Sequence, residues 1–166
     1  MTRQIAVIVH NIRSAHNVGS ILRSAKGLGI NHVYLTGYTP YPLLKRDLRL
    51  PHIAQKIDAR ITKTALGAEN TQNWSHQADV KAVLQGLKAK GYTLAALDLV
   101  PGAVSLVKFK SGGKIALLLG SEIGGVDRML LKKVDLVLKI PMRGRKESFN
   151  VAVAAAITMY HLCYFT

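Results

Sequence analysis

The sequence predicts an α/β domain in which a mostly parallel sheet is flanked by helices. Short, mainly apolar runs recur at residues 5–9, 32–36, 94–97, 115–119 and 134–140, as expected for strands that are buried on both faces. Segments with helical spacing lie between several of these runs. Successive strands are therefore expected to pair in parallel through right-handed crossovers.

The helices are expected in the intervals between the strands. Asn17 can cap a helix that runs to about Leu28 and is ended by Gly29. Further helices are expected over 80–89, just after Gly125, and over the alanine-rich stretch 148–164. Three prolines mark the interval 37–74 as irregular, apart from a short helix near 51–60. No linker or repeat interrupts the chain, so its 166 residues are expected to form one domain over 1–166.

The chain is strongly basic. It holds 23 lysines and arginines against nine acidic residues, which gives a formal net charge of +14. Nearly half of the residues are apolar (49%), enough for a buried core, so a disordered tail protein is excluded. A folded domain of this charge usually binds a polyanion, either nucleic acid or an anionic membrane surface, and the composition favours nucleic acid.

Several classes of protein are not supported. The single cysteine, Cys163, cannot form an intrachain disulfide. The apolar stretches at 5–9 and 151–165 are too short for a signal peptide and a membrane span respectively, so we expect a cytoplasmic protein without a membrane partner. The histidines show no metal-ligand spacing, so no metal is expected. Glycine fingerprints for dinucleotides or nucleoside triphosphates, and the nucleophile elbow of hydrolases, are absent.

Three segments nevertheless suggest a site. Residues 11–23 follow a strand and enter a helix, where free N–H groups attract anions. Arg23 lies nearly two turns beyond Asn17 and is expected to project toward the same end of the sheet. A capped helix with an exposed arginine explains the spacing equally well.

The other two segments also begin at strand ends. Residues 117–127 form an apolar strand and a glycine-rich turn, in which Gly120 allows the backbone to approach a ligand closely. Residues 140–156 run from the end of a strand through a basic loop into the last helix. The alternative for residues 117–127 is an ordinary connection between a strand and a helix. The alternative for the basic loop in 140–156 is a solvated charged turn.

Together the three segments resemble the signature motifs of the SPOUT superfamily, in particular its RNA ribose 2′-O-methyltransferases of the SpoU and TrmH type. The patterns N-V-G-x-x-x-R, L-G-S-E-x-x-G-V and I-P-M followed by S-F-N-V-A-V-A-A-A occur in the family's order and at its spacing. The resemblance covers essentially the whole chain. It implies an α/β fold with a C-terminal trefoil knot, a homodimer, S-adenosylmethionine as cofactor, and tRNA or rRNA as substrate.

The resemblance also implies residue roles. Arg23, Asn17 and Asn150 match positions of the catalytic machinery. Phe149 stands where many relatives have leucine, an apolar exchange. The residues expected to bind the cofactor are Leu97, Leu119, Gly120, Glu122, Ile140, Met142, Ser148 and Phe149. We expect neither the extra N-terminal RNA-binding domain of some rRNA-modifying relatives nor the long extensions of some tRNA-modifying ones.

RNA is expected to be held by basic side chains outside the cofactor site. Arg13 and two groups of basic residues, named below, are expected to form a track that leads to the reactive ribose. Contacts to phosphates can position the RNA in this way without reading its sequence. The alternative for each residue is a solvated surface. The two groups are Lys45, Arg46 and Arg49, and Arg143, Arg145 and Lys146.

Two functional questions stay open from the sequence. Arg23 either acts as the base through a depressed pKa, or grips a phosphate that helps polarise the hydroxyl, because a guanidinium normally stays protonated. The alternative to an enzyme is a non-catalytic RNA-binding domain of the same fold. The last helix is apolar nearly all round, which predicts that it packs on the sheet with one side and meets a second subunit with the other.

Overall fold

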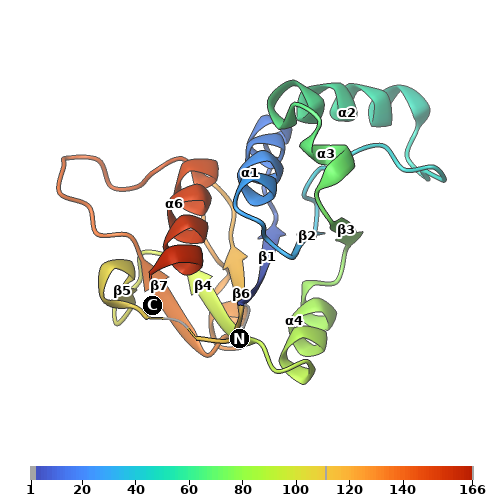
Figure 1. Cartoon of the computed structure of the whole chain (residues 1–166). Coiled ribbons are helices and arrows are strands. Elements are labelled where there is room, and N and C mark those ends of the chain that lie inside the picture. Colours follow the sequence, from blue (N-terminus) through green and yellow to red (C-terminus); the bar gives the residue numbers. More distant parts are fainter. Residues whose placement is uncertain (1–2, 111, 166) are drawn as a thin grey trace.

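The fold is built on a parallel sheet (Figure 1). The computed structural model describes residues 3–110 and 112–165, and in them the sheet has seven strands in the order β3-β2-β1-β6-β4-β7-β5. Every neighbouring pair is parallel, which confirms the predicted fold class. The strands are β1 (Gln4–His10), β2 (His32–Thr36), β3 (Trp74–Gln77), β4 (Thr93–Leu97), β5 (Val104–Ser105), β6 (Lys114–Leu119) and β7 (Leu136–Lys139).

Helices cover both faces of the sheet. Along β1, Val7 and Val9 pack into the core shared with α1 and α6, whereas Ala6 and Ile8 pack into the core shared with α4 and α5. Because side chains alternate between faces, strands covered on both sides need apolar residues at every position. The helices are α1 (Ala15–Gly27), α2 (Pro51–Ala65), α3 (Ala68–Thr71), α4 (Val80–Ala89), α5 (Arg128–Leu131) and α6 (Val151–Tyr164), with a short 3-10 turn at Leu106–Lys108.

A close helix contact explains the glycine of the first motif. A Cβ atom at Gly19 would lie 2.1 Å from Thr64 Oγ1 and 2.3 Å from the Ile61 carbonyl oxygen on α2. Thr64 Oγ1 also donates a hydrogen bond of 2.8 Å to the His16 carbonyl. Gly19 therefore lets α2 pack directly against α1, beyond the sheet (Figure 1).

The structure differs from the sequence prediction mainly at the sheet edges. β3 and β5 were not predicted, and α2 continues to Ala65 instead of ending near residue 60. Each of the two missed strands pairs with a single neighbour. An edge strand needs no continuous apolar run, because only part of its surface is buried; β3 reads Trp-Ser-His-Gln and is half-buried.

Two helix starts also differ. The side chain of Ser14, rather than that of Asn17, caps α1 by accepting the Asn17 N–H at 3.2 Å. Helix α6 begins at Val151 instead of Ser148, because Asn150 caps it by accepting the Ala152 N–H at 2.9 Å. The Asn17 side chain is thus free for other contacts, and Ser148 and Phe149 remain in the loop before α6.

The parallel sheet brings the three motif segments together. The segments after β1, β6 and β7 all leave the sheet at its carboxyl edge, and these strands lie with β4 in the centre of the sheet. The order in which the chain adds strands to the sheet changes direction at β1. Strands β2 and β3 lie on one side of β1, and β6, β4, β7 and β5 lie on the other. Ligands of open α/β sheets bind at such a point. No helix in the described part of the chain is long and apolar enough to cross a membrane.

Candidate functional site

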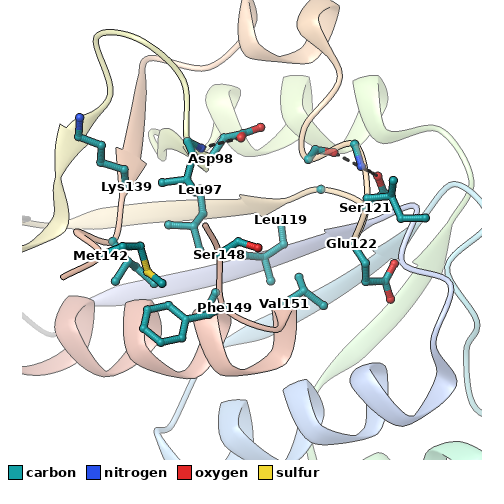
Figure 2. A pocket seen from close by; sticks show the side chains of 17 residues that line it. Leu97, Asp98, Leu119, Ser121, Glu122, Lys139, Met142, Ser148, Phe149 and Val151 are labelled. Atoms are coloured by element: carbon teal, nitrogen blue, oxygen red, sulfur yellow. Dashed lines mark hydrogen bonds between the residues drawn. The ribbon is translucent and has the colours of Figure 1, made fainter. Parts of the chain in front are cut away.

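A cavity opens at the carboxyl edge of the sheet (Figure 2). It measures about 290 Å³ and lies between the ends of β4, β6 and β7 and the start of α6. We call it the central cavity. All eight residues expected to bind the cofactor line it: Leu97, Leu119, Gly120, Glu122, Ile140, Met142, Ser148 and Phe149.

The central cavity is an apolar slot with polar ends. Leu97 and Leu119 form its floor, and Met142 and Phe149 lie close to each other at one side (Figure 2). Lys139 lies at one end of the view and Glu122 at the other. Apolar walls with a few convergent polar groups are typical of small-molecule sites and suit a flat heterocycle with polar substituents.

The glycine-rich turn after β6 is held by its own hydrogen bonds. Ser121 and Gly125 exchange two backbone hydrogen bonds of 2.9 and 3.0 Å. A Cβ atom at Gly120 would lie 2.1 Å from the Gly125 carbonyl oxygen. Gly120 is thus required by the turn itself, because a side chain there would collide with the Gly125 carbonyl. Its close approach to a ligand stays a prediction.

Asp98 is a site residue that the sequence did not reveal. Its carboxylate accepts the Val126 N–H at 2.8 Å and the Leu99 N–H at 2.6 Å, and so joins the end of β4 to the turn after β6. Its only signal in the sequence is an acidic residue directly after an apolar strand. The other lining residues not expected from the sequence are Leu99, Ser121, Ile123, Gly124, Gly125, Lys139, Val151 and Ala154.

Glu122 links the first two motifs. Its carboxylate accepts the N–H groups of Arg13 at 3.0 Å and Ser14 at 3.1 Å, and the Asn17 Nδ2 at 3.1 Å. Partial burial acts to raise the pKa of Glu122, but the hydrogen bonds it accepts outweigh this and lower the pKa below its ordinary value. The ionised carboxylate thus lies against the N-terminus of α1, where negative charge is stabilised.

Asn17 carries the connection on to the third motif. Asn150 Nδ2 donates to Asn17 Oδ1 at 3.2 Å, while Asn150 Oδ1 caps α6. Glu122, Asn17 and Asn150 therefore form one hydrogen-bonded chain, which we call the motif network. It joins residues that are far apart in the sequence, and it borders the central cavity through Glu122.

Arg23 lies away from this network. It is exposed on α1, six residues or about 9 Å of helix rise beyond Asn17. It is not among the residues that line the central cavity. Because α1 runs away from the carboxyl edge after Ser14, the backbone of Arg23 lies nearly two turns from that edge. The projection of its side chain toward the same end of the sheet stays a prediction.

The basic residues lie in two separate groups, and a track that joins them stays a prediction. Lys45 and Arg46 are exposed in the loop before α2, and Arg143, Arg145 and Lys146 are exposed in the loop between β7 and α6. Figure 1 shows these loops extending to opposite sides of α1 and α6. Arg13 belongs to neither loop and lines the wall of a second cavity.

Arg49 has a local structural role. Its guanidinium pairs with Asp47, donates to the carbonyl oxygens of Tyr41 and Pro42, and lies 3.7 Å from the centre of the Tyr41 ring. The hydrogen bonds between the two side chains hold the pKa of Asp47 well below its ordinary value and raise that of Arg49. Arg49 thus shapes the loop before α2, and most of its donors are occupied within that loop.

The comparisons with known proteins identify the family. The chain belongs to the SpoU rRNA Methylase family, which matches residues 4–160. It is 27% identical over 161 residues to a tRNA (guanosine(18)-2'-O)-methyltransferase of Borreliella burgdorferi, covering 97% of this chain and 66% of that protein. It is 29% identical over 167 residues to a 23S rRNA (guanosine(2553)-2'-O)-methyltransferase of Bacillus subtilis, covering 97% and 58%. The chain thus spans about three fifths of the length of these relatives.

Solved structures of relatives share the fold. The AdoMet-bound rRNA methyltransferase from Sinorhizobium meliloti superposes with a TM-score of 0.80 at 22% identity, covering 97% of this chain and 56% of that one. The SpoU methyltransferase AviRb from Streptomyces viridochromogenes, in complex with AdoMet, gives a TM-score of 0.78 at 22% identity, covering 97% and 57%. At this identity the likeness shows the α/β fold.

The turn after β6 gives a first testable prediction. Replacing Gly120 by alanine should lower the free energy of unfolding by about 1–3 kcal/mol, because the new methyl group meets backbone atoms that cannot rotate away. Chemical denaturation measures this. Gly144→Ala is the matched control, since no atom lies within 4 Å of its added Cβ. Equal stability of the two variants would show that the close approach at Gly120 is not a constraint.

Proposed function

We propose that this chain transfers a methyl group from S-adenosylmethionine to a ribose 2′-hydroxyl of tRNA or rRNA. The observation that carries the proposal is the central cavity, which gathers all eight residues implicated in cofactor binding from four separate segments. Membership of the SpoU family supports it. So do relatives named as guanosine 2'-O-methyltransferases of tRNA and rRNA, and a structural neighbour in complex with AdoMet.

The residues of the central cavity fit the proposed cofactor. An adenine ring fits the apolar slot between Leu97, Leu119 and Met142, and backbone groups at the strand ends can bond to its edge. The carboxylates of Asp98 and Glu122 complement the positive charge of a sulfonium and an amino group. When bound, the cofactor supplies an electrophilic methyl group.

The motif network has a positioning role in this proposal. Glu122 and Asn150 use most of their hydrogen-bonding capacity within the protein. They therefore hold the first motif against the mouth of the central cavity rather than carry protons. Holding the ribose oxygen in line with the methyl group is worth up to about 7–11 kcal/mol of the barrier in ideal cases.

Arg23 is proposed to act on the RNA. Its place outside the central cavity supports the indirect route, in which the guanidinium grips a phosphate and helps polarise the hydroxyl. A planar, bidentate donor suits this task, and lysine offers only a point charge. Since tRNA or rRNA is the proposed substrate, we infer a cytoplasmic site of action.

The experiment for this function is a transfer assay. Protein, radiolabelled S-adenosylmethionine and unmodified tRNA or rRNA are combined, and 2′-O-methylated nucleosides are identified after digestion. Arg23→Ala and Arg23→Lys should each lose roughly a hundredfold or more of the rate, with cofactor affinity in calorimetry unchanged. Lys133→Ala, at the opposite edge of the sheet, is the control.

Three outcomes would contradict these assignments. RNA binding by the unaltered protein without cofactor binding would favour a non-catalytic RNA-binding domain. Cofactor binding without transfer to either RNA would contradict the proposed substrates. Near-normal turnover of Arg23→Lys would contradict a special role of the guanidinium.

A homodimer is proposed from the outer side of α6. Ala155, Met159 and Leu162 of this helix are fully buried against the sheet. The opposite side leaves four large apolar side chains exposed at helical spacing: Val153 (47%), Ile157 (37%), Tyr160 (53%) and Tyr164 (63%). A contiguous apolar stripe on one face of a helix supports an interface at that face.

The dimer is tested by mass in solution. Light scattering of the unaltered protein at micromolar concentration should give twice 18.1 kDa. The double variant Ile157→Glu/Tyr160→Glu should give the monomer mass, because charges buried in an interface lack partners. Met129→Glu, an exposed apolar residue on the other face of the sheet, should remain dimeric. A monomeric unaltered protein would refute the proposal.

The C-terminal knot is likewise proposed. Support comes from the strand order, since β7 lies between β4 and β5 although both of these precede it in the chain. The chain after β6 must therefore enter a region already bounded by the β4–β5 segment. The family resemblance of the last two motifs points to the same topology.

The two basic groups are proposed to contact RNA phosphates. Replacing Lys45 and Arg46 by glutamine should weaken RNA binding. The slope of log K against log salt concentration should become shallower by roughly 0.7–0.9 for each phosphate that is no longer neutralised. Arg49 is left unchanged because it shapes the loop. Lys132→Gln/Lys133→Gln, at the amino edge, is the control. An unchanged slope for Lys45→Gln/Arg46→Gln would leave Arg143, Arg145 and Lys146 as the residues that bind phosphate.

A further inference from the structure

A second cavity lies beside the central one. It measures about 620 Å³ and is bounded by the start of α1, the loop after β2, the middle of α2 and the strand β3. We call it the lateral cavity. The methyl-transfer proposal makes no use of it.

The two cavities share a wall. Arg13 and Ser14 line the lateral cavity, and their backbone N–H groups donate to Glu122, which lines the central cavity. A single segment of backbone after β1 therefore separates the two spaces.

The lateral cavity is basic. Arg13, Arg49 and Arg60 line it, and no acidic residue does. Arg49 is neutralised by Asp47. In the part of the chain that the structure describes, the side chains of Arg13 and Arg60 form no ion pair, and both are exposed. Two guanidinium groups are thus available to an anion.

The lateral cavity also offers flat aromatic surfaces. Tyr41 stacks on His76 with ring centres 3.9 Å apart, and Arg49 covers the other face of Tyr41. Burial lowers the pKa of His76 below its ordinary value, which favours the neutral ring. Tyr38 lines the same space and is 57% exposed, although it is a large aromatic residue. Its ring is available for stacking.

We propose that the lateral cavity binds an unstacked nucleotide of the RNA, next to the one whose ribose reaches the central cavity. The base stacks on Tyr38, and Arg13 and Arg60 hold the adjoining phosphate. Proteins recognise single-stranded RNA by this combination of aromatic stacking and arginine contacts. The inference rests on the proposed function, since the shared wall makes the lateral site a neighbour of the methylated ribose.

The test is a binding titration with a labelled single-stranded RNA of about ten nucleotides, followed by fluorescence anisotropy between roughly 50 and 200 mM salt. Tyr38→Ala should raise Kd roughly 5- to 150-fold with an unchanged salt slope, because it removes stacking and no charge. Tyr38→Phe should bind nearly as well as the unaltered protein. Arg60→Gln should reduce the slope by about 0.7, the value for one phosphate of a single strand.

Controls separate this site from a general loss of binding or folding. Lys133→Gln removes a charge at the amino edge and should leave Kd within about twofold. The Tyr38 side chain is exposed, so its truncation should leave the melting temperature unchanged. If Tyr38→Ala binds within twofold of the unaltered protein, or if Arg60→Gln keeps the full slope, the lateral cavity does not hold a nucleotide.

Methyl transfer measured on the same variants distinguishes the two proposals. Transfer by the unaltered protein with kcat/KM unchanged in Tyr38→Ala would overturn the lateral site and leave the reaction standing. RNA binding that depends on Tyr38 and Arg60, without any methyl transfer, would support the lateral site and overturn the reaction.

Discussion

The carboxylate of Glu122 accepts hydrogen bonds from the backbone of the segment after β1 and from the side chain of Asn17, and the rest of the site depends on these contacts. They fix the start of α1 against the turn after β6. Through Asn150 the same network reaches the cap of α6. One ionised group thereby sets the relative positions of three segments that are remote from one another along the chain.

The turn that carries Glu122 is itself fixed from two sides. Gly120 allows the backbone of Gly125 to approach, and Asp98 accepts the Val126 N–H from the neighbouring strand end. Asp98 and Glu122 therefore both bond to backbone N–H groups rather than to basic side chains. This arrangement lets the site carry negative charge beside a cavity in a protein of net charge +14, where free acidic groups would otherwise attract lysines and arginines.

The parallel sheet explains why two cavities adjoin. All strands end at the same edge, so the segments that follow β1, β2, β4, β6 and β7 crowd together there. The apolar strand ends line the central cavity. Basic and aromatic residues of the segments around β2 and β3 line the lateral cavity. A cofactor and a polynucleotide differ in these same properties, so the two cavities match the two proposed ligands.

The sequence by itself predicted the class of fold, the family and eight of the residues that line the central cavity. Strands buried on both faces must be apolar throughout, and the motifs hold residues whose chemistry is local to strand ends. Only the tertiary structure showed that Ser14 caps α1, that Asp98 joins the site, that Arg23 lies outside the central cavity and that Arg49 is committed to Asp47. These facts depend on distances between side chains and on the direction in which each element runs. Periodicity and motif spacing report which element a residue belongs to, but not which side chain from another element has already taken its hydrogen bonds.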